Sequence, residues 1–362
     1  MNLKTRFDGL SLNNPLMPAS GPLVGDLEKL TFMQDAGVGA IVTKTISTKS
    51  PKIPKPCIYA GKNYIMNSEL WSEHSMTRWL EEILPAFKKT LDRPLIISVG
   101  YSKEDMKVLI PKLDAFASAF EISTHYVGTD LNVIYDTVKT IRGLTKKPFY
   151  MKISPHMPDA KAYAETIKKA GANGVAAINS LGPTMNINLK TRAIEYGADD
   201  GFVWTSGPAI KPLALATIYK IKQAEPTLTV LGVGGVASAE DVLEFMLAGA
   251  DGVQMLSAAL LKGVSLYEKI IKDLPKALEK YGFDSIEAVK KTRLENRCSY
   301  EDRLPTLIED KCVECMLCVK TCPYFAITFE DKITFNPDKC FSCGLCVSIC
   351  PTNAIKMANV GE

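Results

Sequence analysis

The stretch TVLGVGGVASAEDVLEFMLAGADGVQMLSA, residues 229–258, predicts a strand, a glycine-rich turn, a helix and a second strand. The two apolar runs, 229–235 and 252–258, have the length of buried strands, and a helical pattern over residues 238–248 separates them. Strands that are apolar throughout and alternate with helices indicate a parallel sheet covered on its faces. This unit is typical of an α/β protein.

Six more apolar runs of strand length precede this unit, with helical patterns between the strands. The apolar runs span residues 15–21, 40–47, 95–100, 120–126, 149–154 and 174–180, and the helical patterns span residues 103–117, 159–170 and 212–224. A further helical pattern, residues 266–280, follows the last strand. Alternation through eight strands predicts a closed (β/α)8 barrel, which we assign to residues 1–282.

Two connections in this barrel are much longer than the usual few residues. One follows the second strand, over residues 48–93, and the other follows the sixth, over residues 181–204. Both leave the C-terminal ends of strands, where barrels build their active sites. We therefore expect them to form substrate loops or lids.

Length and composition fit a barrel with a small appended domain, since 362 residues exceed the roughly 250 of a typical barrel. The composition, 46% hydrophobic with a net charge of +3, indicates a globular protein without bulk attraction to nucleic acid or membranes. The N-terminal stretch has no signal-peptide core, and no run approaches the roughly 18 apolar residues of a membrane span. We expect a cytoplasmic protein with neither kind of partner.

The C-terminal region contains two matching cysteine runs, KCVECMLCVKTCP at residues 311–323 and KCFSCGLCVSICP at residues 339–351. Each has the spacing C-x2-C-x2-C-x3-C-P, which resembles the bacterial two-cluster ferredoxins. In this arrangement three cysteines of a run bind one [4Fe–4S] cluster and the fourth binds the other. We assign residues 311–362 to a ferredoxin-like domain and residues 283–310 to a connector.

The spacing predicts two sets of cluster ligands. One set is Cys312, Cys315, Cys318 and Cys350, and the other is Cys322, Cys340, Cys343 and Cys346. A zinc ribbon is the alternative, but it uses two separated C-x2-C pairs and fits two complete four-cysteine runs poorly.

A ferredoxin domain fused to a barrel requires a redox centre in the barrel. Loops after the seventh and eighth strands of barrels commonly bind phosphate, and here they carry Gly234, Gly235 and Ser257. The segment from Gly232 to Ala237 also matches a dinucleotide-binding fingerprint. That alternative places its acidic residue before the next strand rather than at its end and leaves the other strand–helix units unexplained.

Residues 1–270 resemble the dihydroorotate dehydrogenases, and the order of barrel and ferredoxin domain resembles dihydropyrimidine dehydrogenase. Most of the matching pieces lie at or just after a predicted strand end. They are residues 14–21, 43–45, 66–68, Lys152, 178–180, 206–207, 210–212, 234–235 and 253–258.

The resemblance implies an FMN barrel and a role for each matching residue. Ala19, Ser20 and Gly21 would pack along the flavin, and Lys44 would lie near both the flavin ring and the substrate. Lys152 would place positive charge near flavin N1 and O2. Asn67, Asn179 and Ser180 would hydrogen-bond the amide edges of a cyclic substrate. The flavin phosphate would be held by Ser206, Gly207, Gly234, Gly235 and Ser257.

The loop after the fourth strand departs from the family pattern, which reads N-x-S-C-P-N or N-x-S-C-P-H. The stretch from Glu121 to Tyr126 reads EISTHY, so Thr124 replaces the cysteine that transfers a proton. Thr124 or His125 is therefore the expected proton donor. Glu121 and Tyr126 replace substrate-binding residues, and a carboxylate accepts but does not donate hydrogen bonds. We expect Glu121 to set substrate choice.

These features predict an FMN-dependent oxidoreductase acting on a CH–CH or C=C bond of a dihydroorotate- or dihydropyrimidine-like substrate. Two [4Fe–4S] clusters would relay electrons to or from an NAD(P)H-oxidising flavoprotein subunit or a ferredoxin, and the chain could form a homodimer. One alternative is an electron-transfer subunit without substrate chemistry of its own. Another is a tRNA-modifying flavin barrel, which calls for a basic face and a cysteine acid.

Overall fold

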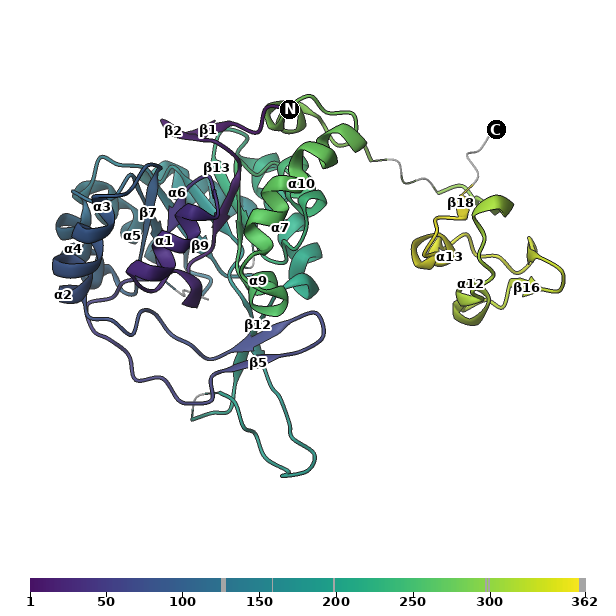
Figure 1. Ribbon diagram of the computed structural model, residues 1–362, viewed down its shortest axis with the longest axis horizontal. Helices are drawn as coiled ribbons and strands as arrows, with labels where there is room; N and C mark the ends of the chain where they lie inside the picture. Colours follow the sequence, from purple (N-terminus) through teal and green to yellow (C-terminus); the bar gives the residue numbers. More distant parts are fainter. Residues whose placement is uncertain (125–127, 158, 198, 297, 299, 358–362) are drawn as a thin grey trace. The chain divides into compact units, whose positions relative to one another are not determined.

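The computed structural model describes residues 1–124, 128–157, 159–197, 199–296, 298 and 300–357. The chain forms two compact units, Met1–Leu294 and Glu295–Glu362 (Figure 1). No helix in the described part of the chain is long and apolar enough to cross a bilayer.

The first unit is built on eight parallel strands, which confirms the predicted (β/α)8 barrel. Their order around the sheet is β3 (Leu16–Pro18), β14 (Gly252–Met255), β13 (Thr229–Val233), β10 (Gly174–Ala177), β9 (Phe149–Ile153), β8 (Ala119–Ile122), β7 (Leu95–Val99) and β4 (Ile41–Val42). The N–H of Gly39, just before β4, donates to the Leu16 carbonyl at 2.8 Å and joins the two ends of the sheet. A Cβ at Gly39 would lie 1.9 Å from the Asn14 carbonyl oxygen, so this closure requires glycine.

Helices surround the strands and bury one apolar face each (Figure 1). The longer ones are α1 (Leu27–Asp35), α4 (Lys103–Leu113), α5 (Leu131–Leu144), α6 (Ala160–Ala170), α7 (Lys211–Ala224), α8 (Ala239–Leu247) and α10 (Leu266–Lys280). The shorter ones are α2 (Met76–Arg78), a π-helical segment (Trp79–Ile83), α3 (Leu84–Lys88), α9 (Ser257–Lys262) and α11 (Ile286–Lys291). Side-chain caps set several starts: the Ser238 hydroxyl accepts from the Asp241 N–H at 3.1 Å and begins α8 directly after the β13 turn.

The two ends of the barrel are closed differently. An N-terminal hairpin, β1 (Thr5–Phe7) and β2 (Leu10–Leu12), packs Phe7 and Leu12 against Tyr150 and Leu231 in the barrel interior. The two long connections lie on the opposite side of the unit (Figure 1). The site described below lies at the end that carries the long connections.

The long connections form a second sheet, which the sequence did not predict. Strands β5 (Ile58–Ala60) and β6 (Ile65–Asn67) from the first connection pair with β11 (Leu181–Thr184) and β12 (Val203–Ser206) from the second. The order is β11-β12-β6-β5, all antiparallel, and Trp204 of β12 lies opposite Asn67 of β6. This flap sheet ties both connections together.

The second unit has the two-fold repeat of a ferredoxin-like domain, as predicted. Its described residues form two antiparallel strand pairs, β15 (Pro305–Leu307) with β18 (Ile355–Met357) and β16 (Ile327–Phe329) with β17 (Ile333–Phe335), and two helices, α12 (Leu317–Thr321) and α13 (Leu345–Ile349). Equivalent positions of the two cysteine runs, Glu314 and Ser342, both have left-handed backbone conformations, with φ of 50° and 56°. The segment expected to be a connector, residues 283–310, contributes α11 to the first unit and β15 to the second.

Candidate active site and cluster sites

Most residues predicted to bind cofactor and substrate line one open cavity of about 580 Å³, a volume that includes the solvent at its mouth. The cavity lies at the C-terminal ends of the barrel strands, beside the flap sheet. The predicted residues that line it are Ala19, Ser20, Asn67, Lys152, Asn179, Ser180, Ser206, Gly207, Gly234, Gly235 and Ser257. Gly21 is not among the lining residues, and a Cβ there would lie 2.3 Å from the side chain of the lining residue Leu256.

One part of the cavity has the features of a phosphate cradle. The Ser206 and Ser257 hydroxyls lie 2.8 Å apart, at the end of β12 and the start of α9. Gly235 has a φ of 94°, and a Cβ there would lie 2.8 Å from the Lys211 backbone nitrogen at the start of α7. Backbone that approaches a helix start this closely, with two hydroxyls beside it, suits the phosphate of FMN.

The amide side chains lie at another part of the wall. Asn67 accepts a hydrogen bond from the Glu69 N–H at 2.9 Å, and Asn179 accepts one from the Ser180 N–H at 2.9 Å. Because each amide uses its carbonyl oxygen in this way, its NH2 group is the part that can donate to a ligand carbonyl. This arrangement suits a cyclic amide.

Lys152 occupies the cavity floor with a buried counter-ion. Its Nζ lies 3.3 Å from Oε1 of Glu121 and 3.3 Å from Oε1 of Gln254, and Gln254 donates to Oε2 of Glu121 at 2.8 Å. Lys152 and Gln254 line the cavity, but Glu121 lies behind them and is 0% exposed. The Glu121 carboxylate is thus bonded to Lys152 and Gln254, and its expected part in substrate choice stays a prediction.

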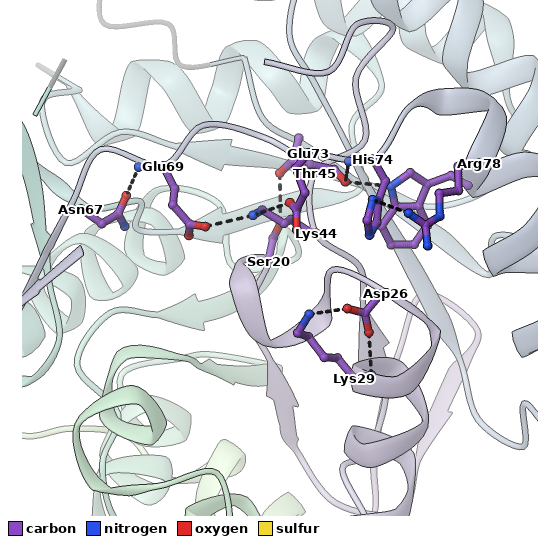
Figure 2. Close-up of polar contacts among 12 residues, drawn as sticks. Ser20, Asp26, Lys29, Lys44, Thr45, Asn67, Glu69, Glu73, His74 and Arg78 are labelled. Atoms are coloured by element: carbon purple, nitrogen blue, oxygen red, sulfur yellow. Dashed lines mark hydrogen bonds and ion pairs between the residues drawn. The ribbon is translucent and has the colours of Figure 1, made fainter. Parts of the chain in front are cut away.

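Lys44 is held by two carboxylates from the first long connection. It donates to Glu69 at 3.1 Å and to Glu73 at 2.9 Å (Figure 2), and its side chain is 3% exposed. Burial raises the pKa of Glu73, but the hydrogen bond and charge of Lys44 outweigh it and hold that pKa below its usual value. Sequence reasoning missed both glutamates, although they follow Asn67 by only two and six residues.

A chain of hydroxyls fixes the wall beside Lys44. The Ser20 hydroxyl lies 3.0 Å from that of Thr45, which lies 2.9 Å from that of Ser98 (Figure 2 shows the first of these contacts). The hydroxyl of Ser20, which lines the cavity, is therefore held by Thr45, the residue that follows Lys44.

Of the two expected proton donors, the structure describes Thr124, which follows the end of β8 by two residues. Thr124 lines a neighbouring hollow of about 510 Å³, and Lys152 lines both this hollow and the main cavity. His125 and Tyr126 lie outside the described residues, so the structure does not place their side chains.

In the second unit the eight cysteines of the two runs surround two hollows. Cys312, Cys315, Cys318 and Cys350 line one, and Cys322, Cys340, Cys343 and Cys346 line the other. The Ala326 N–H donates to the Cys322 sulfur at 3.4 Å, and the Ala354 N–H donates to the Cys350 sulfur at 3.2 Å. Backbone donors to ligand sulfurs are typical of iron–sulfur sites, so these residues fit two [4Fe–4S] clusters.

Comparison with known protein families gives two matches. The dihydroorotate dehydrogenase family matches residues 2–278, and the 4Fe-4S dicluster domain matches residues 311–354.

Relatives of the first unit are named dihydroorotate dehydrogenase B (NAD(+)), catalytic subunit. The relative from Pyrococcus furiosus is 31% identical over 300 residues, which cover 80% of this chain and 98% of that protein. The relative from Listeria monocytogenes is 32% identical over 305 residues (80% and 98%), and that from Oceanobacillus iheyensis is 30% identical over 313 residues (81% and 99%). About a fifth of this chain therefore has no counterpart in these three proteins.

Proposed function

The chain belongs to the dihydroorotate dehydrogenase family, and we propose that it exchanges electrons between a dihydroorotate- or dihydropyrimidine-like substrate and a separate redox partner. It is a flavoprotein oxidoreductase that acts on CH–CH groups, with FMN and two [4Fe–4S] clusters as its cofactors. In the oxidative direction a ring CH–CH unit loses a hydride and a proton and becomes C=C, and in the reductive direction both return.

The observation that carries this proposal is the composition of the 580 Å³ cavity. It combines a phosphate cradle, a lysine on its floor and two amide donors on its wall. A relay between redox centres needs only the first two features. The amide donors Asn67 and Asn179 favour substrate chemistry in this chain, because they match the carbonyl groups of a cyclic amide.

The residues divide the work between binding and proton transfer. Asn67, Asn179 and Ser180 orient the ring, and Lys152 provides positive charge beside the flavin site. Thr124 or His125 moves the proton at the substrate carbon. Bound FMN supplies the exchange between two-electron chemistry at the substrate and one-electron transfer to the clusters.

The relatives' name supports a separate redox partner, because it describes a catalytic subunit of an NAD(+)-dependent enzyme. The cluster domain gives electrons a route out of the barrel. We propose that they pass to or from an NAD(P)H-oxidising flavoprotein subunit or a ferredoxin.

Anaerobic purification followed by visible spectroscopy tests this function. The oxidised protein should show flavin bands. If the enzyme works in the oxidative direction, dihydrouracil or dihydroorotate should bleach these bands. If it works in the reductive direction, uracil or orotate should reoxidise the dithionite-reduced flavin. A protein whose flavin and clusters cycle with dithionite but respond to none of these compounds would be an electron-transfer subunit without substrate chemistry.

A further inference from the structure

The charges around the cavity bear on which ring the site accepts. The family resemblance assigns Lys44 to the substrate and Lys152 to the flavin. Lys152 lines the cavity, Lys44 is next to the lining residue Asn67 through its partner Glu69, and three carboxylates pair with the two lysines. We propose that the site selects an uncharged, dihydropyrimidine-type ring over a ring that carries a carboxylate, such as dihydroorotate. This inference rests on the proposed function and narrows its substrate class.

The ammonium of Lys152 is already paired with a carboxylate, so it is not available to a substrate anion. Among the described residues it is the only charged side chain that lines the cavity, and its ammonium lies 3.3 Å from the fully buried Glu121 carboxylate. Glu121 also accepts from Gln254 and is 0% exposed, so its carboxylate stays beside Lys152 whatever the cavity holds. The Lys152–Glu121 pair therefore offers a ligand no net charge.

Two carboxylates pair with the single ammonium of Lys44. Glu69 lies 3.1 Å and Glu73 2.9 Å from its Nζ, so this cluster carries a net negative charge. Glu69 is 15% exposed, and its backbone N–H donates to Asn67, which lines the cavity. A substrate carboxylate would have to displace one of these glutamates from Lys44 and would then lie beside it.

The balance of the two clusters is therefore one negative charge, close to the amide donors. A carboxylate brought there loses its hydration without gaining an unpaired cation, and like charges brought together in a partly buried site repel strongly. An uncharged ring needs only the carbonyl and N–H partners that Asn67, Asn179 and Ser180 provide. The same charges therefore penalise the anionic ring alone.

Uracil and orotate form a matched pair for the test, because they differ by the carboxylate. Each would be titrated into the oxidised holoprotein, with binding measured by perturbation of the flavin absorption and by calorimetry. We expect uracil to bind at least about tenfold more tightly, a difference of about 1.4 kcal/mol. Removing the carboxylates in Glu69→Gln/Glu73→Gln should reduce this preference by about tenfold, mainly through tighter orotate binding.

A matched control is Glu165→Gln/Glu268→Gln, which removes two carboxylates from exposed ion pairs on the outer helices α6 and α10 and should leave the preference unchanged. If the Glu69→Gln/Glu73→Gln variant fails to fold, the single variant Glu73→Gln and the ratio of uracil to orotate affinity in wild type still test the inference. Orotate binding as tightly as uracil would overturn the inference while leaving the proposed function intact. Failure of both compounds to bind would overturn the proposed function itself, and this inference with it.

Discussion

The Lys152 ammonium lies 3.3 Å from the Glu121 carboxylate, and this pair places a buried negative charge directly behind the cation of the cavity floor. The family pattern has asparagine at the position of Glu121, so a neutral amide is replaced by a charge. Positive charge beside a flavin stabilises its reduced form, and we expect Glu121 to offset this effect of Lys152.

Glu121→Gln should therefore raise the two-electron midpoint potential of the flavin. A change of tenfold in the equilibrium corresponds to about 30 mV, and we expect a rise of at least that size. Lys152→Met should shift the potential in the opposite direction, and Glu165→Gln should not shift it. Potentials measured by anaerobic dye titration would check this, and an unchanged value in Glu121→Gln would show that the pair does not act on the flavin.

Gly235→Ala should abolish FMN binding. The added Cβ would lie 2.8 Å from the Lys211 backbone nitrogen, and φ at this position is 94°. Gly263 is a matched control, since its φ is 99° but a Cβ there would have nothing within 4 Å. Flavin released from Gly263→Ala and from wild type should run as FMN at one per chain, and Gly235→Ala should release almost none. Equal flavin content in both variants would rule out this cradle.

Cys322→Ser should damage the cluster that the second cysteine run holds. The Cys322 side chain lines the same hollow as Cys340, Cys343 and Cys346, although it belongs to the first run. Wild type should contain about eight irons and eight acid-labile sulfides, and the variant should keep about four of each. Cys298 is exposed and outside both runs, so Cys298→Ser should keep all eight irons. Zinc in place of iron in wild type would contradict the cluster assignment.

Thr124→Ala and His125→Ala, tested separately, should identify the proton donor. Loss of a general acid or base slows turnover by about 10²–10⁴-fold. The donor variant should show this loss in substrate-coupled flavin turnover while dithionite still reduces its flavin normally. Full activity in both variants would place the donor elsewhere in the site.

The sequence was sufficient for the parts of the molecule that depend on local patterns. Apolar runs predicted the eight barrel strands, because each strand is one continuous apolar segment and helices separate most of these segments. Cysteine spacing predicted two ligand sets. The lining of the two hollows has the same grouping, since the fourth cysteine of each run lies with the first three of the opposite run.

Contacts between distant segments were not predictable in the same way. The flap sheet joins Asn67 to Trp204, and its strands are only three or four residues long, too short to give a periodic signal. Lys44 meets Glu69 and Glu73 only because the first long connection folds back over the second strand.

The direction of Glu121 could have been inferred from strand geometry. Glu121, Lys152 and Gln254 each interrupt an apolar strand with a polar side chain. Side chains inside a barrel alternate with those outside, so three such interruptions on barrel strands indicate an internal polar cluster.

The most direct test of the central claim is an anaerobic titration of the holoprotein followed by visible and electron paramagnetic resonance spectroscopy. Dihydrouracil should bleach the oxidised flavin and produce the signals of reduced clusters. Alternatively, uracil should restore the flavin absorption of the dithionite-reduced protein and remove its reduced-cluster signals. In either direction two electrons should be exchanged per substrate molecule. Flavin and clusters that respond to dithionite but to neither the dihydropyrimidines nor dihydroorotate and orotate would contradict the account.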